Sequence, residues 1–155
     1  MYNVLGFMNS IISSTSQEPA NYSSVNYFSK MAIDGNWDTF QHTKEIPGEI
    51  CWWKATFIST IHITRFVIVA RVQEGIQFTG RINGIKVYTV LYKQDNAEKS
   101  EEHLLVETSS LATITTQSNP TKEFKVTAFK GVAADELLLK RIELMNFSEI
   151  YIYGY

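Results

Sequence analysis

Residues 32–43 read AIDGNWDTFQHT, and a tryptophan pair follows at 52–53. Asp34, Gly35 and Asn36 form turns readily, because glycine permits positive φ and Asx side chains bond to their own backbone. Oxygens on alternate residues of such a turn can also converge on a hard cation such as Ca²⁺. The stretch therefore predicts a turn, and its residue types alone leave open whether a cation binds there.

The bulk composition predicts one folded domain, spanning residues 1–155, that is long enough to bury a core. Hydrophobic residues make up 45% of the chain and the formal net charge is −2. This charge argues against nucleic-acid binding and against adsorption to an anionic membrane. No apolar run approaches the roughly 20 residues that span a bilayer, so we expect no transmembrane segment.

The location of the protein is suggested only weakly by its sequence. The first residues, MYNVLGF, lack the basic region and the long apolar stretch of a secretory signal. Cys51 is the one cysteine, so no internal disulfide can form. We expect a secreted or cell-surface domain cut from a longer precursor, and a cytosolic protein is the alternative.

Short runs of β-branched and aromatic residues alternate with turn signals along most of the chain. We expect strands at 52–57, 61–70, 85–92, 122–129 and 149–155, and one helical turn at 27–33. The alternation of apolar and polar residues slips once near Thr64, which predicts a bulge. Residues 93–102 predict an exposed charged loop, whereas 136–144 fit either a helix or a strand. The whole pattern predicts an all-β, antiparallel β-sandwich.

No recognised catalytic motif is present, which argues against an enzyme. His42 lies in the turn region among aromatic residues, and Arg71 and Arg81 stand at the two ends of a glycine-containing loop. One histidine and two guanidinium groups near one end of a sheet would make a donor-rich pocket for hydroxyl, carboxylate or phosphate oxygens. The alternative is that all three are ordinary rim residues in ion pairs.

The order of motifs along the chain is distinctive. Ala-Ile-Asp-Gly-Asn is followed by Thr-Phe-x-His-Thr, Trp-Trp, a strand that ends in arginine, and Gly-Arg-Ile-Asn-Gly-Ile-Lys-Val. The chain closes with Phe-Ser-Glu-Ile-Tyr-Ile at 147–152. This order resembles the discoidin or F5/8 type C superfamily, and within it the F-type, fucose-binding lectins. The resemblance covers about residues 3–153 and implies an eight-stranded jelly roll.

The resemblance also implies a structural Ca²⁺ under loops that recognise L-fucose. By position, the carboxylates would come from Asp34 and Glu149, the backbone carbonyls from Asn36, Met31 and Ser148, and a further oxygen from Thr43. The sugar-binding trio would be His42, Arg71 and Arg81, with Phe78 or Trp37 packing on the apolar edge of the sugar.

The sequence departs from the F-type pattern around its second arginine. Gln73 stands where an aspartate is usual, and seven residues, 74–80, separate it from Arg81. The adjacent cysteines that often line the fucose methyl pocket are missing. We expect a non-enzymatic carbohydrate-binding (lectin) module for fucosylated glycans that gains avidity through oligomers or tandem domains. The alternatives are a discoidin-type adhesion or protein-interaction module, an intracellular scaffold subunit and, more remotely, a hydrolase.

Overall fold

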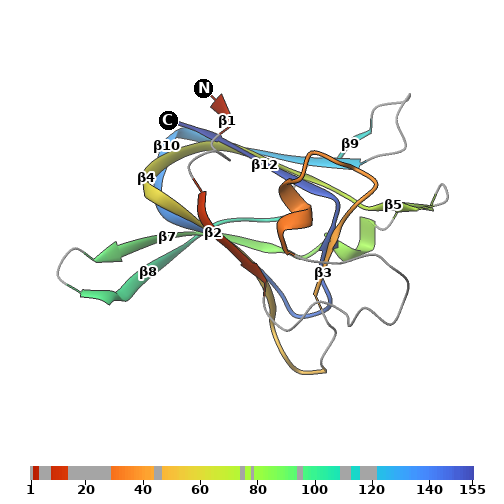
Figure 1. The fold of residues 1–155 in the computed structure, drawn as a ribbon, viewed down its shortest axis with the longest axis horizontal. Helices are drawn as coiled ribbons and strands as arrows, with labels where there is room; N and C mark the ends of the chain where they lie inside the picture. Colours follow the sequence, from red (N-terminus) through yellow and green to blue (C-terminus); the bar gives the residue numbers. More distant parts are fainter. Residues whose placement is uncertain are drawn as a thin grey trace.

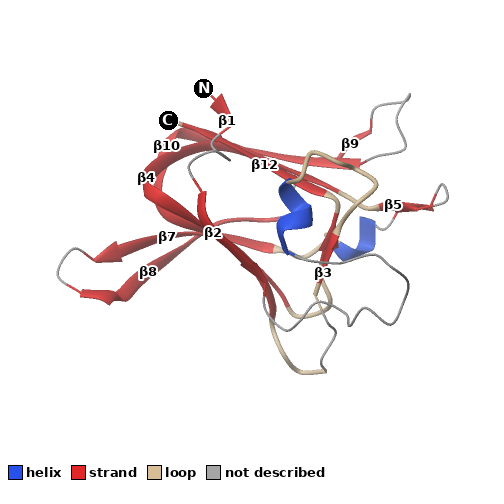
Figure 2. Cartoon of the chain, viewed as in Figure 1, coloured by secondary structure: helices blue, strands red, loops and turns tan. Residues whose placement is uncertain are grey.

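The computed structural model describes residues 2–3, 8–13, 29–43, 47–73, 76–77, 79–93, 96–108, 113–115 and 122–155. Most of these residues lie in antiparallel strands, and the helical part consists of two short 3-10 turns (Figure 2). None of the helices in these ranges is long and apolar enough to cross a membrane. The all-β prediction is confirmed.

The main sheet contains eight strands, in the order β1-β12-β4-β10-β7-β8, with β2 paired to β4 and β9 paired to β10. Two small ribbons, β3–β11 and β5–β6, lie outside this sheet. The strands are β1 (Tyr2–Asn3), β2 (Met8–Ser13), β3 (Gln41–His42), β4 (Cys51–Val69), β5 (Val72–Gln73), β6 (Ile76–Gln77), β7 (Lys86–Lys93), β8 (Asn96–Glu107), β9 (Thr113–Thr115), β10 (Lys122–Arg141), β11 (Asn146–Phe147) and β12 (Glu149–Gly154). The 3-10 turns are η2 (Ser29–Ile33) and η3 (Thr79–Arg81).

The two longest strands, β4 and β10, run through both layers of a sandwich. Residues 51–57 of β4 pair with β2 and with the end of β10, which in turn pairs with β7. Residues 61–69 of β4 pair with β12 and with the start of β10. Figure 1 shows β4 and β10 curving together where the layers meet. The two layers are therefore joined by continuous strands.

The core lies between the two layers and is built by alternate residues of each strand. From the first layer come Trp53, Ala55, Phe57, Val87, Leu137 and Leu139, and from the second Ile63, Phe66, Ile68, Ile150 and Ile152. The expected bulge near Thr64 is confirmed, because Ile63 pairs with Gly154 and Arg65 with Tyr153, which leaves Thr64 as the extra residue. This bulge moves Ile63 and Phe66 onto the same face.

A register irregularity between Ala134 and Glu136 of β10 precedes residues 136–144, of which 136–141 form a strand. At this irregularity one residue of β10, Asp135, stands against four residues of β4, 57–60, so the extra residues belong to β4. Beyond it the alternation is that of a strand, with Leu137 in the core and Glu136 on the opposite face. The Asp135 carboxylate accepts hydrogen bonds from Thr60 Oγ1 at 2.5 Å and from the backbone N–H of Tyr92 at 2.7 Å. Asp135 thus joins β10 to its neighbours on both sides.

The prediction of an exposed loop at 93–102 is wrong, because β8 begins at Asn96 and continues to Glu107. This strand lies at the edge of the sheet order, where charged side chains discourage pairing with another molecule. Two of its glutamates form ion pairs, Glu101 with Lys93 of β7 at 2.9 Å and Glu102 with Lys140 of β10 at 2.8 Å. Edge strands and loops are both exposed to solvent and rich in charged residues, so composition alone could not distinguish this strand from a loop.

Gly154 sits where the end of β12 passes close to β4, so its substitution is predicted to destabilise the sandwich. A Cβ on Gly154 would overlap the carbonyl oxygen of His62, a backbone atom that cannot move alone. We expect Gly154→Ala to lower the free energy of unfolding by about 1–3 kcal/mol in a urea titration. Gly80→Ala is the matched control, because a Cβ there meets no heavy atom within 4 Å. Equal stability of the two variants would contradict this account of the strand contact.

Candidate functional site

The 32–43 stretch folds as a 3-10 turn, η2, followed by a tight Asx turn. The Asp34 carboxylate accepts hydrogen bonds from the Asn36 N–H at 2.9 Å and from Thr39 Oγ1 at 2.6 Å. The Asn36 side chain accepts one from the Asp38 N–H at 3.0 Å. Gly35 has φ of +77°, which explains why glycine follows Asp34. The predicted turn is confirmed.

The turn is tied to the first residue of β12, 114 residues away in sequence. The Gly35 N–H donates to Glu149 Oε1 at 2.9 Å, and Glu149 is fully buried. Burial and the nearby Asp34 carboxyl raise the pKa of Glu149 to about 8. Burial also acts to raise the pKa of Asp34, but its bonds with Thr39, Glu149 and the Asn36 backbone outweigh this and lower it. The structure therefore brings together the two acids that the sequence proposed as ligands.

Two buried oxygens, one within this acid pair and one beside it, lack a hydrogen-bond partner among the described residues. They are Glu149 Oε2 and Ser148 Oγ. A buried oxygen without a partner is costly, and a hard cation with six to eight oxygen ligands would satisfy it. No group of three or more His, Cys, Asp or Glu side chains gathers in the described ranges, so such a site would depend on carbonyl and hydroxyl oxygens. The donor set fits Ca²⁺.

The other proposed ligands are engaged to different degrees. Thr43 is buried, and its hydroxyl donates to the Met145 carbonyl at 3.2 Å and accepts from the Met145 N–H at 2.8 Å. The Asn36 carbonyl accepts a hydrogen bond from the Thr39 N–H at 3.3 Å, and it shares the single proton of the Thr39 hydroxyl, 2.8 Å away, with Asp34. Met31 is half-buried in η2.

A second cluster forms around β3, at the same end of the sandwich. Phe40 and His42 are two residues apart on an extended segment, and their rings lie 6.5 Å apart at 54°. The Arg71 guanidinium carbon lies 3.7 Å from the centre of the Phe40 ring, which places a cation over the aromatic face. His42 Nδ1 lies 2.7 Å from the Thr43 carbonyl oxygen. The structure thus brings together His42 and Arg71, two members of the predicted trio, around Phe40.

Sequence reasoning missed two residues of this cluster. Phe40 is its buried centre, and the Thr-Phe-x-His spacing could have placed it beside His42, because residues i and i+2 of an extended segment share a face. Asn146 pairs directly with His42 across the β3–β11 ribbon. It is fully buried, and neither polar atom of its amide has a hydrogen-bond partner among the described residues. No local pattern connects positions 42 and 146.

The remaining predicted sugar contacts lie elsewhere or outside the described residues. Arg81 ends η3, a turn held to the end of β10 by the Arg141–Gly80 hydrogen bond of 2.8 Å. The Trp37 indole N–H donates to the Tyr151 hydroxyl at 2.8 Å, which directs this ring toward β12. Phe78 lies outside the described residues.

Comparisons with known proteins bear on the fold. No family model matches the chain, and no curated protein sequence matches it either. The chain is similar to a solved fucolectin from striped bass (Morone saxatilis) serum, with a TM-score of 0.68 and 16% identity over 99% of this chain. It spans about half of that protein, 48% of its length.

Two smaller solved structures match over nearly their whole length. A Streptococcus pneumoniae fucose-binding module has a TM-score of 0.62 and 16% identity, covering 100% of this chain and 99% of the module. A family 32 carbohydrate-binding module from Clostridium perfringens NanJ, solved with galactose, has a TM-score of 0.58 and 17% identity, covering 95% and 93%. At these identities the likeness establishes the fold. The chain therefore has a β-sandwich fold that it shares with this fucolectin and these carbohydrate-binding modules.

Proposed function

We propose that the chain is a non-enzymatic carbohydrate-binding module that binds a fucosylated glycan with the loops around β3. The observation that carries this proposal is the Phe40, His42 and Arg71 cluster at one end of the sandwich. It combines an aromatic ring, an imidazole and a guanidinium, which are the groups that hold a small polar ligand in a shallow pocket. The solved structures similar to this chain include modules that bind fucose or galactose.

The contacts of His42 and Arg71 suggest how a sugar would be held. With Nδ1–H donating to the Thr43 carbonyl, Nε2 is the acceptor of a neutral His42 ring, and we assign it to a sugar hydroxyl. Arg71 rests on the Phe40 ring, which fixes the plane of its guanidinium, and the N–H groups of this planar fork suit sugar oxygens.

We expect the segment from Arg71 to Arg81 to determine which sugar the module prefers. This segment contains the small β5–β6 ribbon, in which Val72 pairs with Gln77 and Gln73 with Ile76. A monosaccharide offers few atoms to a shallow pocket, so binding by one site is weak, and oligomers or tandem domains would supply avidity.

We propose further that a structural Ca²⁺ binds between the turn and β12, with Asp34 and Glu149 as its carboxylate ligands. The buried Glu149 Oε2 and Ser148 Oγ support this assignment, as do the two carboxyl groups that face each other. The ion would neutralise this pair and hold the 32–43 stretch, and with it Phe40 and His42, against the last strand.

Single substitutions at the β3 cluster test the lectin proposal. On a glycan array, we expect His42→Ala and Arg71→Ala each to weaken binding to fucosylated glycans about tenfold or more, because each variant loses its hydrogen bonds to the sugar hydroxyls. The matched controls are His62→Ala, an exposed histidine stacked on Tyr155, and Arg65→Ala, an arginine stacked on Tyr153.

The array also separates the alternatives. Selective binding to galactosides would support the carbohydrate-binding proposal and refute the specificity for fucose. A blank array obtained with folded, calcium-loaded protein would refute the lectin proposal and favour a discoidin-type protein-interaction module.

Calcium removal tests the metal proposal separately. A ligand at one hundred times its Kd stabilises the native state by about 2.7 kcal/mol, so Ca²⁺ is expected to raise the Tm by about 5–10 °C over that in EDTA. Glu149→Gln is expected to abolish this difference, whereas Glu49→Gln, an exposed glutamate, is expected to keep it. Identical melting curves of the wild-type protein in Ca²⁺ and in EDTA would exclude the ion.

A further inference from the structure

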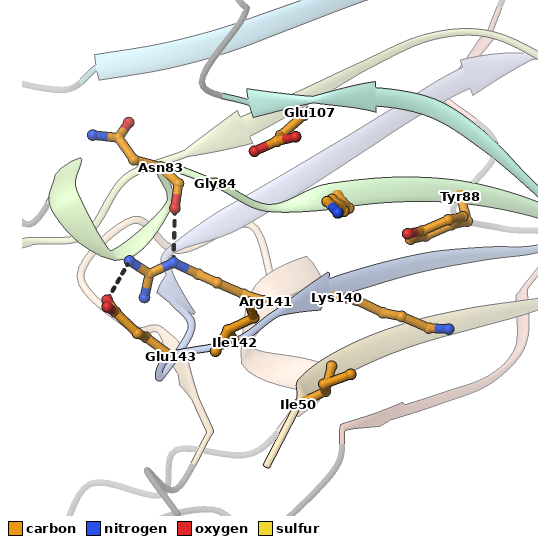
Figure 3. A pocket seen from close by; sticks show the side chains of 10 residues that line it. Ile50, Asn83, Gly84, Tyr88, Glu107, Lys140, Arg141, Ile142 and Glu143 are labelled. Carbon is orange, nitrogen blue, oxygen red and sulfur yellow. Dashed lines mark hydrogen bonds and ion pairs between the residues drawn. The ribbon is translucent and has the colours of Figure 1, made fainter. Parts of the chain in front are cut away.

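The outer face of the β4-β10-β7-β8 layer, which points away from the core, is hollowed along its length. One hollow of about 560 Å³ is lined by residues that include Asn83, Tyr88 and Ile142 (Figure 3). A second of about 450 Å³ is lined by residues that include Trp52 and Leu138. Both are lined by Ile50 and Lys140, so the two hollows form one groove, here called the sheet groove.

Strand register explains why aromatic, aliphatic and charged side chains meet in the sheet groove. Lys140 of β10 pairs with Trp52 of β4 on one side and with Lys86 of β7 on the other. Leu138, two residues earlier and on the same face, pairs with Tyr88 of β7. In Figure 3 the Tyr88 and Lys140 side chains lie beside each other above Ile50, and the Lys140 amine is 5.1 Å from the Tyr88 ring centre.

The charges of the sheet groove balance. Four cationic side chains line it, Lys54, Lys86, Lys140 and Arg141, and four acidic ones, Glu102, Glu107, Glu136 and Glu143. Three of the contacts between them are direct: Lys54–Glu136 at 3.2 Å, Lys140–Glu102 at 2.8 Å and Arg141–Glu143 at 3.1 Å. A groove without excess charge offers no net attraction to a polyanion or a polycation.

The same charges argue against a second copy of the chain as the occupant. The centre of a protein–protein interface is depleted of charged residues, whereas eight of them line this groove. Ligand sites for small polar molecules instead combine apolar and aromatic walls with a few polar groups that fix orientation. Tyr88, Trp52 and Ile50 provide the walls here, and paired amines and carboxylates offer donors and acceptors side by side.

We propose that the sheet groove is a second binding site, for an extended, uncharged oligosaccharide chain. Apolar faces of successive sugar rings would lie against Tyr88 and Trp52, and vicinal hydroxyls would bond to the Lys140–Glu102 and Lys54–Glu136 pairs. The proposal does not rest on the β3 cluster, because none of its lining residues belongs to that cluster.

Affinity electrophoresis tests this proposal with the whole chain. Native gels containing hydroxyethylcellulose, laminarin, arabinoxylan or galactomannan are compared with gels that contain no polysaccharide. We expect at least one polymer to retard the wild-type protein, and Tyr88→Ala to weaken that binding about tenfold or more. Ile50→Arg blocks the groove from an exposed position and is expected to do the same, while Ile58→Arg, at an equally exposed isoleucine outside the groove, adds the same charge without effect.

The outcomes distinguish the two sites. His42→Ala is expected to remain retarded, and loss of retardation in this variant would assign the binding to the β3 cluster and overturn the proposal. Retardation by none of the polymers, or equal retardation of the Ile50→Arg and Ile58→Arg variants, would overturn it as well. So would a dimer in sedimentation that Ile50→Arg converts to a monomer, because the groove would then be an interface between copies.

Discussion

Asp135 holds the sandwich at the point where its layers meet. Its carboxylate bonds to Thr60 in the bend of β4 and to the backbone of Tyr92 in β7, so one side chain fixes three strands. The alternation of β10 also reverses at Asp135, which stands against four residues of β4, 57–60, so that Ala134 and Leu137 are both buried. Without this reversal Glu136 would point into the core and Leu137 into the solvent.

The site end of the molecule depends on a second long-range contact, between the Gly35 N–H and Glu149. Through it, the last strand of the sandwich fixes a turn that comes early in the chain. β3 follows this turn and pairs with β11, which is separated from Glu149 by Ser148 alone. Phe40 and His42 are therefore positioned by the core strand β12 rather than by their own short ribbon.

The sequence predicted the fold class, the turn at Asp34 and the bulge at Thr64, because each depends on local alternation or on residues with strong turn preferences. It did not predict that β4 and β10 are continuous, since a bent strand and two separate strands share one pattern. It also mistook the start of β8 for a loop. The acid pair came from resemblance, whereas the closeness of His42 to Arg71 was expected from their positions at one end of the predicted sheet. The pairing of Asn146 with His42, which neither approach supplied, joins distant segments of the chain. No single-sequence pattern encodes such pairing.

The β5–β6 ribbon makes its own hydrogen-bonded pairs, Val72–Gln77 and Gln73–Ile76, and shares no ladder with the main sheet. Lengthening a loop of this kind costs little, about 0.6 kcal/mol for each doubling of its length. Residues can thus be gained or lost beside Arg71 while the core packing around Trp53 and Phe66 stays unchanged. In evolutionary terms, the length of this segment and the thermodynamic stability of the domain are separate traits, and selection can alter one without a compensating change in the other.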